Sequence, residues 1–218
     1  MIVRVWRRAS EAGVGPVVVA AAEAVIVEAV EKAGGRAVLT DPDLPSGTDR
    51  VFRALQSIDS EGSHDVVVNV QGDLPDLDPS SVRAVLRTLT QTRSDIATLA
   101  APITERAQRS NPAVVKAVVS WTSDEVGRAL YFTRAEAPAG DGPLYYHIGI
   151  YAFSRAALNR FVALQPSSLE LQEKLEQLRA LEAGMSIAVG RVDRVPLSVD
   201  TQVDLDEARR VLAARKGS

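Results

Sequence analysis

The chain carries a short apolar run that passes directly into a polar turn: Val66-Val67-Val68-Asn69-Val70-Gln71-Gly72-Asp73-Leu74-Pro75. Consecutive valines are typical of a strand that is buried on both faces, and the Gly-Asp-Leu-Pro that follows is typical of a turn. This order places the Asp73 carboxylate where a buried strand meets solvent. Ligands of open α/β sheets bind outside the carboxyl ends of the strands. Asp73 is therefore the first candidate site residue.

A second carboxylate of this kind, Asp200, occurs near the C-terminus in Leu197-Ser198-Val199-Asp200-Thr201. Mg²⁺ that handles phosphates takes a few carboxylates plus substrate oxygens, so we expect Asp73 and Asp200 to converge in one crevice and bind Mg²⁺. Phosphoryl or nucleotidyl transfer is the chemistry that this pairing favours. Structural alternatives remain: Asp73 can form an Asx-turn before Pro75, and Asp200 or Thr201 can cap the last helix, with Asp204 completing a capping box.

Strands and helices alternate from residue 1 to about residue 101. The apolar spacing predicts a helix ending at Gly13, a strand at 17–20, a helix at 23–33 stopped by Gly34-Gly35, a strand at 37–39, a helix opened by Ser46 and the strand before Asp73. This order is typical of parallel βαβ units with right-handed crossovers. We therefore predict an α/β fold with a Rossmann-like, mostly parallel sheet flanked by helices.

The pattern changes after residue 101. Strands are predicted at 114–119, 129–132 and 147–153 with little helix between them, which favours an added antiparallel lobe that covers the substrate. A long helix is predicted at 169–182 with a stripe of Leu171, Leu175, Leu178 and Leu181, then a strand at 187–192 and a helix from about Gln202. We expect one domain, 1–218, with a substrate and dimerisation lobe at about 112–185.

Composition excludes several classes of protein. The 218 residues are 46% hydrophobic and 24% charged, as in one sizeable globular domain. A net charge of −3 gives no basic field for nucleic acid, so we expect no nucleic-acid partner. No cysteine is present, which excludes disulfides and thiolate metal sites and suits the cytoplasm. No apolar run is long enough for a membrane span or a secretory signal.

Seven strings occur in order along the chain. They are Ser46-Gly47-Thr48-Asp49-Arg50, Asn69-Val70-Gln71-Gly72-Asp73, Asn111-Pro112-Ala113-Val114-Val115-Lys116, Ala129-Leu130-Tyr131-Phe132-Thr133-Arg134-Ala135, His147-Ile148-Gly149-Ile150-Tyr151, Leu175-Glu176-Gln177-Leu178-Arg179 and Val199-Asp200-Thr201. Together, and over nearly the whole chain, they resemble the 3-deoxy-manno-octulosonate cytidylyltransferases, or CMP-Kdo synthetases. The fifth and sixth strings favour Kdo over sialic-acid synthetases.

The resemblance implies transfer of CMP from CTP to the anomeric hydroxyl of Kdo, with release of pyrophosphate, a requirement for Mg²⁺ and a homodimer. By the same match, Asp73 and Asp200 would bind the metal. The nucleotide would lie near Gln71 and the segment Ser46, Gly47, Thr48, Asp49 and Arg50, and the sugar site would contain Arg134, His147, Glu176 and Gln177. The general base stays unassigned.

The sequence departs from the family pattern in three places. Met1-Ile2-Val3 matches the residues just after the family's Arg- and Pro-rich triphosphate loop, so that loop and its strand are expected to be lacking. Ala22 stands where the family commonly has Asp, and Leu74 where it often has Glu. Two alternatives therefore stay open: a non-catalytic sugar-binding remnant, and a synthetase for a related sugar acid such as 8-amino-Kdo.

Several candidates also have structural interpretations. Ser46 with Asp49 forms a helix-capping pattern, and a lone His such as His147 on an apolar strand is more often packed and hydrogen-bonded than catalytic. We expect His147 to bind a sugar hydroxyl without acid–base work. Glu176 and Gln177 are predicted in mid-helix, where solvent exposure is the default.

Two basic residues end predicted strands. Arg134 has a planar fork that suits the Kdo carboxylate, although most arginines lie on the surface. Lys116 is a candidate phosphate contact, although a lysine that ends a strand is usually solvated.

Overall fold

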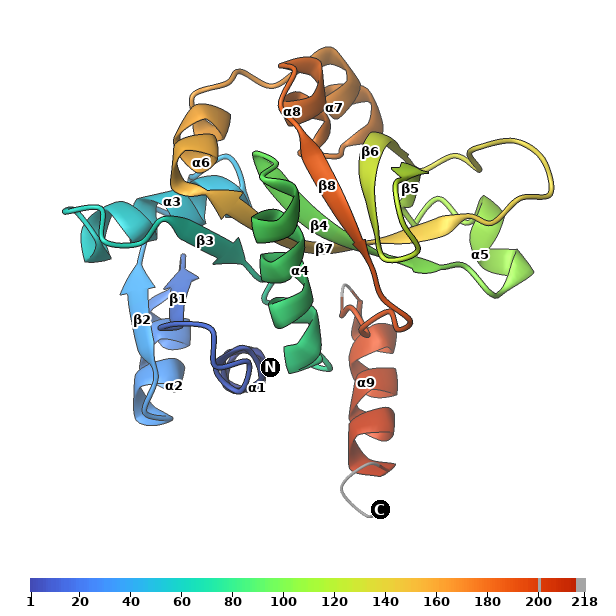
Figure 1. Ribbon diagram of the computed structural model, residues 1–218. Helices are drawn as coiled ribbons and strands as arrows, with labels where there is room; N and C mark the ends of the chain where they lie inside the picture. Colours follow the sequence, from blue (N-terminus) through green and yellow to red (C-terminus); the bar gives the residue numbers. More distant parts are fainter. Residues whose placement is uncertain (200, 215–218) are drawn as a thin grey trace. The chain divides into compact units, whose positions relative to one another are not determined.

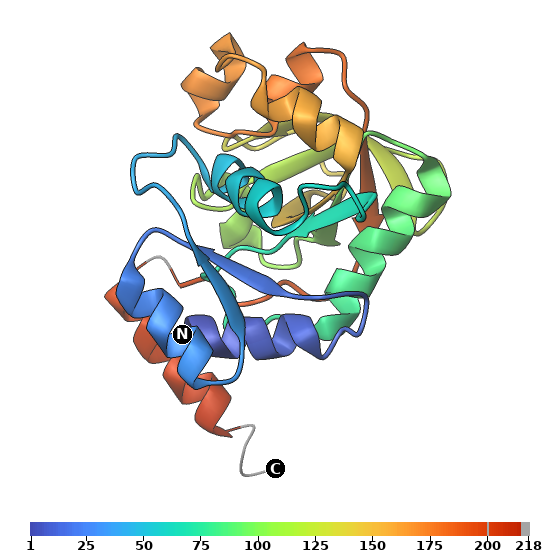
Figure 2. The ribbon, with the colours of Figure 1, turned by 90° about the vertical axis from the view of Figure 1, so that its left-hand side faces the viewer.

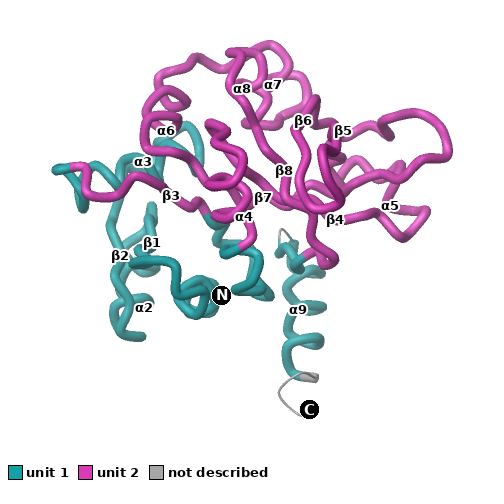
Figure 3. The backbone as a smooth tube through the Cα atoms, in the orientation of Figure 1, with its two compact units in different colours: residues 1–61, 70–83, 196–218 teal, residues 62–69, 84–195 magenta. Residues whose placement is uncertain are grey.

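The computed structural model describes residues 1–199 and 201–214. The chain divides into two compact units, shown in different colours in Figure 3. Unit 1 comprises residues 1–61, 70–83 and 196–218, and unit 2 comprises residues 62–69 and 84–195. The lobe predicted at about 112–185 lies within unit 2.

Unit 1 contains a parallel pair of strands, β1 (Val18–Ala21) and β2 (Arg36–Leu39), connected by α2 (Ala24–Lys32). The opening helix α1 (Ile2–Ser10) and α2 pack against this pair (Figure 2). The buried cluster consists of Val19, Ala21 and Val30, with Ile2, Val3, Trp6, Ile26, Val27 and Ala37 packed around it. The four elements predicted for the start of the chain are confirmed.

The predicted stop of α2 at two glycines is also confirmed, for two different reasons. Gly34 has a φ of +86°, a conformation that glycine adopts at little cost. A Cβ on Gly35 would lie 2.6 Å from Val30 Cγ1 and 2.8 Å from Trp6 Cε2. Gly35 therefore lets the chain pass closely over the core of unit 1.

The remaining helices of unit 1 begin at side-chain caps. Ser46 caps α3 (Gly47–Ile58), since its Oγ accepts from the Asp49 N–H at 3.1 Å. Before α9 (Gln202–Ala214), Asp204 Oδ2 accepts from the Thr201 N–H at 2.8 Å, and the Asp204 N–H donates to Thr201 Oγ1 at 3.2 Å. The predicted caps of both helices are confirmed.

Unit 2 is built on a six-stranded sheet with the order β3-β7-β4-β8-β6-β5 (Figure 1). Its strands are β3 (Val66–Asn69), β4 (Ile96–Pro102), β5 (Lys116–Trp121), β6 (Val126–Thr133), β7 (Tyr145–Ser154) and β8 (Ile187–Arg191). β4 and β8 pair in parallel, whereas β7 pairs antiparallel with both β3 and β4. β5 and β6 form an antiparallel hairpin beside β8.

The α/β class with a helix-flanked sheet is confirmed, but the expected mostly parallel sheet is wrong for unit 2. Only β4 and β8 pair in parallel there, because β7 lies antiparallel between β3 and β4 and the β5–β6 hairpin is antiparallel. β3 and β4 share one direction because both run against β7, and β8 runs with β4. The sequence did not place β7 between β3 and β4. Apolar alternation predicts a strand but carries no information about its neighbours.

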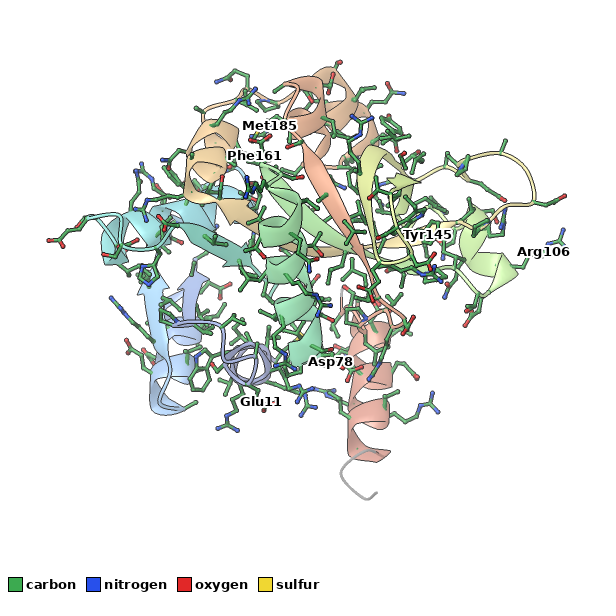
Figure 4. All side chains as sticks on the ribbon, viewed as in Figure 1. Glu11, Asp78, Arg106, Tyr145, Phe161 and Met185 are labelled. Atoms are coloured by element: carbon green, nitrogen blue, oxygen red, sulfur yellow. The ribbon has the colours of Figure 1, made fainter. Side chains whose placement is uncertain are left out.

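Helices α4 (Pro79–Thr92), α5 (Arg106–Ser110) and α6 (Arg155–Val162) connect the strands, and the boundary between the units falls inside α4. The core of unit 2 includes six of the seven residues of β4 and the fully buried Phe132, Ile150 and Leu158. Phe161 of α6, labelled in Figure 4, packs with its ring centroid 5.7 Å from that of Phe153.

The long helix predicted at 169–182 is wrong. The structure has two short helices, α7 (Ser168–Glu173) and α8 (Leu178–Glu182), separated at Lys174, which has a φ of 56°. Glu182, at the end of α8, accepts hydrogen bonds from the start of α7, including the Leu169 N–H at 3.1 Å. These bonds hold the two helices as a hairpin. In this arrangement Leu171 of the predicted stripe is 66% exposed.

No helix in the described parts of the chain is long and apolar enough to cross a membrane.

Asp95, at the start of β4, is tied to Ser186, which precedes β8. Its Oδ2 accepts from the Ser186 N–H and Oγ–H, both at 2.8 Å. Burial raises the pKa of Asp95, but the Ser186 hydrogen bonds and the charge of Arg160 outweigh burial and hold the pKa below its ordinary value of 3.8. A carboxyl with a depressed folded pKa contributes stability above its unfolded pKa and loses it as the pH falls.

We therefore expect Asp95→Asn to lower the free energy of unfolding by about 1 kcal/mol at neutral pH. The difference from the wild type should shrink as the pH falls below about 4, measured by urea unfolding at several pH values. Asp141→Asn, at an exposed loop carboxylate of the same unit, is the control. A difference that does not vary with pH would contradict the assignment.

Candidate active site

Asp73 of unit 1 lies beside the segment that leads to the second predicted carboxylate. Ser198 Oγ donates to Asp73 Oδ2 at 3.2 Å, and the Val199 N–H donates to the Asp73 carbonyl at 2.9 Å. Residue 200, which follows in the chain, lies outside the described residues, so the structure does not test the metal role of Asp200. The contact brings together the two sequence segments on which the predicted metal site depends.

The loop after Asp73 is fixed by two arginines of α1. Arg4 Nε donates to the Pro75 carbonyl at 2.8 Å, and Arg8 Nε donates to the Leu77 carbonyl at 2.9 Å. Leu77 is fully buried, which anchors the other side of the loop. Arg4 and Arg8 lie one helical turn apart. The sequence did not predict their role, because the apolar spacing of the opening helix does not indicate what its polar face contacts.

The nucleotide-side candidates of unit 1 also meet. A Cβ on Gly47 would lie 3.5 Å from Gln71 Oε1, so Gly47 and Gln71 are neighbours. Ser46 is occupied as the cap of α3, and Thr48 is only 2% exposed. Ser46 and Thr48 therefore have structural roles in starting the helix, and Gly47 and Gln71 present a backbone and an amide side by side.

Arg134 of unit 2 is anchored at the end of β6. Its Nε donates to the Glu173 carbonyl at 2.9 Å and its Nη1 to the Pro112 carbonyl at 3.0 Å. The Glu173 carboxylate accepts from the Arg134 N–H at 2.9 Å and from Thr133 Oγ1 at 2.7 Å. Glu173 thus connects α7 to the end of β6, and the sequence contained no spacing signal for this role.

Lys116 is fully buried, which corrects both sequence interpretations of it. Its Nζ donates to the carbonyls of Asn111 at 2.7 Å and Arg134 at 3.0 Å. Burial lowers the pKa of Lys116, Glu136 raises it and Arg134 lowers it further. The ammonium therefore joins the start of β5 to the end of β6 and is neither solvated nor placed as a phosphate contact.

His147 is 7% exposed and packed, as a lone histidine on an apolar strand usually is. Its Nε2 lies 3.0 Å from Thr98 Oγ1, and its ring centroid lies 4.7 Å from that of Phe132 and 5.6 Å from that of Tyr151. Burial lowers the pKa of His147 to about 3. The ring is therefore neutral at physiological pH.

The break between α7 and α8 changes the environment of Glu176 and Gln177. Gln177 is 5% exposed, so the expectation of a solvated mid-helix residue is wrong for it. No hydrogen-bond partner of its buried Nε2 is found in the described residues. Burial, and then the charge of Glu176, raise the pKa of Tyr151, which places Glu176 near the His147–Tyr151 pair.

Within residues 1–199 and 201–214, no group of three or more His, Asp or Glu side chains is arranged as a metal site. A two-carboxylate site that includes Asp200 falls outside that search.

Comparisons with known proteins identify the family of the chain. A profile of the cytidylyltransferase family matches residues 1–187. The 3-deoxy-manno-octulosonate cytidylyltransferase of Parvibaculum lavamentivorans is 63% identical over 215 residues, which cover 99% of this chain and 83% of that protein. The chain belongs to the 3-deoxy-manno-octulosonate cytidylyltransferase family. It is therefore a nucleotidyltransferase, as the sequence strings predicted.

Other relatives support the same family. The 3-deoxy-manno-octulosonate cytidylyltransferase of Rhodospirillum centenum is 60% identical over 219 residues and covers 100% of this chain and 85% of that protein. A solved CMP:2-keto-3-deoxy-manno-octonic acid synthetase complexed with CTP has a TM-score of 0.89 at 34% identity, covering 98% of this chain and 88% of that one. The 4-diphosphocytidyl-2C-methyl-D-erythritol synthase of Anaerococcus prevotii, at 13% identity and a TM-score of 0.63, shares the fold alone over 97% of this chain and 89% of that one.

In this cytidylyltransferase, Lys116→Met keeps the length of the side chain but removes the donor to two carbonyls. We expect the free energy of unfolding to fall by about 2 kcal/mol. The loss of the two hydrogen bonds from the ammonium outweighs the gain from no longer burying a charge. Denaturant unfolding measures this, with Lys32→Met at a lysine that is 79% exposed as the matched control. A Lys116→Met protein as stable as the wild type would show that the two bonds contribute nothing.

Proposed function

We propose that this cytidylyltransferase transfers CMP from CTP to 3-deoxy-D-manno-octulosonate, forming CMP-Kdo and pyrophosphate for lipopolysaccharide synthesis. Membership of the family and 34% identity to a synthetase solved with CTP support the proposal. The single structural observation that carries it is the pairing of Asp73 with Ser198 and Val199. This pairing supports a site in which two carboxylates distant in sequence act on one nucleotide.

The residues at Asp73 suit Mg²⁺. Carboxylate oxygens are the ligands that Mg²⁺ prefers, and Asp73 and Asp200 would hold it. The Asp73 backbone is hydrogen-bonded to Val199, and its loop is held by Arg4 and Arg8. Asp73 is therefore fixed before any ligand binds. When bound, Mg²⁺ supplies positive charge that offsets the charge developing on the phosphates.

The reaction changes two bonds to phosphorus. The anomeric oxygen of Kdo forms a bond to the α-phosphorus of CTP, the bond from that phosphorus to the pyrophosphate oxygen breaks, and the Kdo hydroxyl loses its proton. Gly47 and Gln71 are assigned to the nucleotide, because a glycine backbone allows close approach and an amide both donates and accepts. Ser46 and Thr48 support them from the start of α3.

The sugar is assigned to Arg134, His147, Glu176 and Gln177 of unit 2. Arg134 would pair with the Kdo carboxylate, and its bonds to Glu173 and Pro112 hold it in place for that purpose. Buried donors normally have a hydrogen-bond partner. The buried Gln177 Nε2 has none among the described residues, which supports the proposal that it donates to an oxygen of the ligand. The neutral ring of His147 would bind a sugar hydroxyl.

The proposal extends to the setting of the enzyme. We place the reaction in the cytoplasm, where a protein without cysteine is at no disadvantage, and expect a homodimer formed through the lobe at about 112–185. A synthetase for a related sugar acid such as 8-amino-Kdo, and a sugar-binding protein without transferase activity, are the alternative outcomes of a substrate panel and of calorimetry with CTP and Kdo.

Asp73→Asn tests the metal and nucleotide half of the proposal. We expect kcat for Kdo- and Mg²⁺-dependent pyrophosphate release from CTP to fall by about a hundredfold or more, because a charged ligand is lost. Ser198→Ala is the matched control: it removes one bond to Asp73 but keeps the carboxylate, so its effect should be much smaller. Full activity of Asp73→Asn would overturn the assignment of Asp73.

Gln177→Met tests the sugar half. Removing a buried donor that has no described partner should raise the free energy of unfolding by about 1 kcal/mol, and the same change should weaken Kdo binding about tenfold. Denaturant unfolding and titration calorimetry measure the two effects, with Gln172→Met at an exposed position of α7 as the control. Loss of stability together with unchanged Kdo binding would give Gln177 a purely structural role.

A further inference from the structure

Thr98 lies at an irregularity of the sheet in unit 2. Ala97 of β4 pairs with Ala152 of β7, and Leu99 pairs with Ile148, so the three β7 residues 149–151 stand opposite Thr98 alone. Such a bulge interrupts the ladder of backbone hydrogen bonds and re-aims the side chains around it. Thr98 is fully buried, so its hydroxyl has to find its hydrogen-bond partners within the protein.

The hydrogen bonds of Thr98 determine which ring nitrogen of His147 carries a proton. Thr98 Oγ1 lies 2.9 Å from the Ile150 carbonyl, 3.1 Å from the Ile148 carbonyl and 3.0 Å from His147 Nε2. A hydroxyl has one hydrogen, and a carbonyl can only accept. When that hydrogen goes to a carbonyl, the bond to His147 requires Nε2–H as the donor and Oγ1 as the acceptor.

The opposite arrangement is less favourable. If Nε2 carried the lone pair, the Thr98 hydrogen would go to Nε2, and neither bulge carbonyl would receive it. The site would then have one hydrogen bond fewer than with Nε2–H as a donor, which costs about 0.5–1.5 kcal/mol. The Phe132 and Tyr151 rings pack against the His147 ring and resist its rotation. A ring held at one nitrogen and packed by two aromatic neighbours keeps one orientation.

We propose that Thr98 is a positioning residue that fixes His147 as the neutral Nε2–H tautomer and leaves Nδ1 as a hydrogen-bond acceptor for a ligand hydroxyl. A lone pair attracts a hydroxyl hydrogen but repels a carboxylate or keto oxygen. His147 therefore recognises a hydroxyl group of the sugar acid, and it does not recognise its carboxylate. The ligand part of this inference rests on the proposed function, whereas the tautomer is a property of the free protein.

The tautomer can be measured directly, because the chain has only two histidines, His64 and His147. His64→Gln in the full-length, ¹⁵N-labelled protein leaves one imidazole to observe in long-range ¹H–¹⁵N correlation spectra. We expect a protonated-type shift for Nε2 and an unprotonated-type shift for Nδ1, unchanged between about pH 5 and pH 8. A spectrum of the Nδ1–H tautomer, or of an imidazolium in this range, would overturn the proposal.

Substitutions at Thr98 test the cause. Thr98→Val keeps the shape but removes the hydroxyl, and we expect the pure Nε2–H signature to be lost, while Thr98→Ser restores it. Thr88→Val is the matched control, since Thr88 is also buried in unit 2 but its hydroxyl bonds to Ala84 within α4. If Thr98→Val does not fold, Thr98→Ala removes the same hydroxyl and should lose the pure Nε2–H signature in the same way. A Thr98→Val spectrum identical to that of the wild type would overturn the role of Thr98.

Kinetics test the ligand part. We expect Thr98→Val to raise KM for Kdo about five- to tenfold with KM for CTP unchanged, and Thr98→Ser and Thr88→Val to behave like the wild type. An equal rise in both KM values would overturn hydroxyl recognition by His147. A wild-type protein that neither binds Kdo nor releases pyrophosphate would refute the proposed function. In that case the spectra of the free protein would still decide the tautomer.

Discussion

A contact between chain segments 125 residues apart, from Asp73 to Ser198, holds the proposed metal site together. Closing so long a loop has a large entropic cost, which the fold as a whole has to offset. The loop carrying Asp73 is held on its other side by Arg4 and Arg8 through its own carbonyls. The Asp73 carboxylate is therefore held in place in advance, as a ligand of the proposed Mg²⁺ has to be if the ion is to be positioned without rearrangement of the protein during the reaction.

Unit 2 achieves the same rigidity with a buried lysine and two half-buried charged residues instead of a long loop. Lys116 and Arg134 donate to backbone carbonyls, and Glu173 accepts from the end of β6. A buried charge is costly unless its bonds are complete, so each such residue has essentially one low-energy arrangement. The Thr98–His147 bond is buried too, but it joins two side chains. Of the sugar-side candidates, Arg134 is therefore held by bonds to backbone carbonyls and His147 by its bond to Thr98.

Local signals predicted local features well. Ser46 capped its helix, Gly34 and Gly35 ended theirs, and Thr201 formed its box with Asp204, because each depends on residues within four positions of one another. The prediction of one helix at 169–182 was wrong because a contact between its two ends decides the structure. Its apolar spacing fits a helix throughout, but Glu182 bonds back to the start of α7 and the chain turns at Lys174. That bond has no signature in a periodic pattern.

Residue type, apolar period and ordered motifs are local properties, and they were sufficient to predict the α/β class, the positions of most strands, the family and the identity of the candidate residues. The fold set the environment of those residues. It placed β7 between β3 and β4, buried Lys116 and Gln177, and set His147 against Thr98 at a bulge. Burial and hydrogen-bond partners arise from contacts between distant segments, and these contacts set the charge state and donor or acceptor role of a side chain.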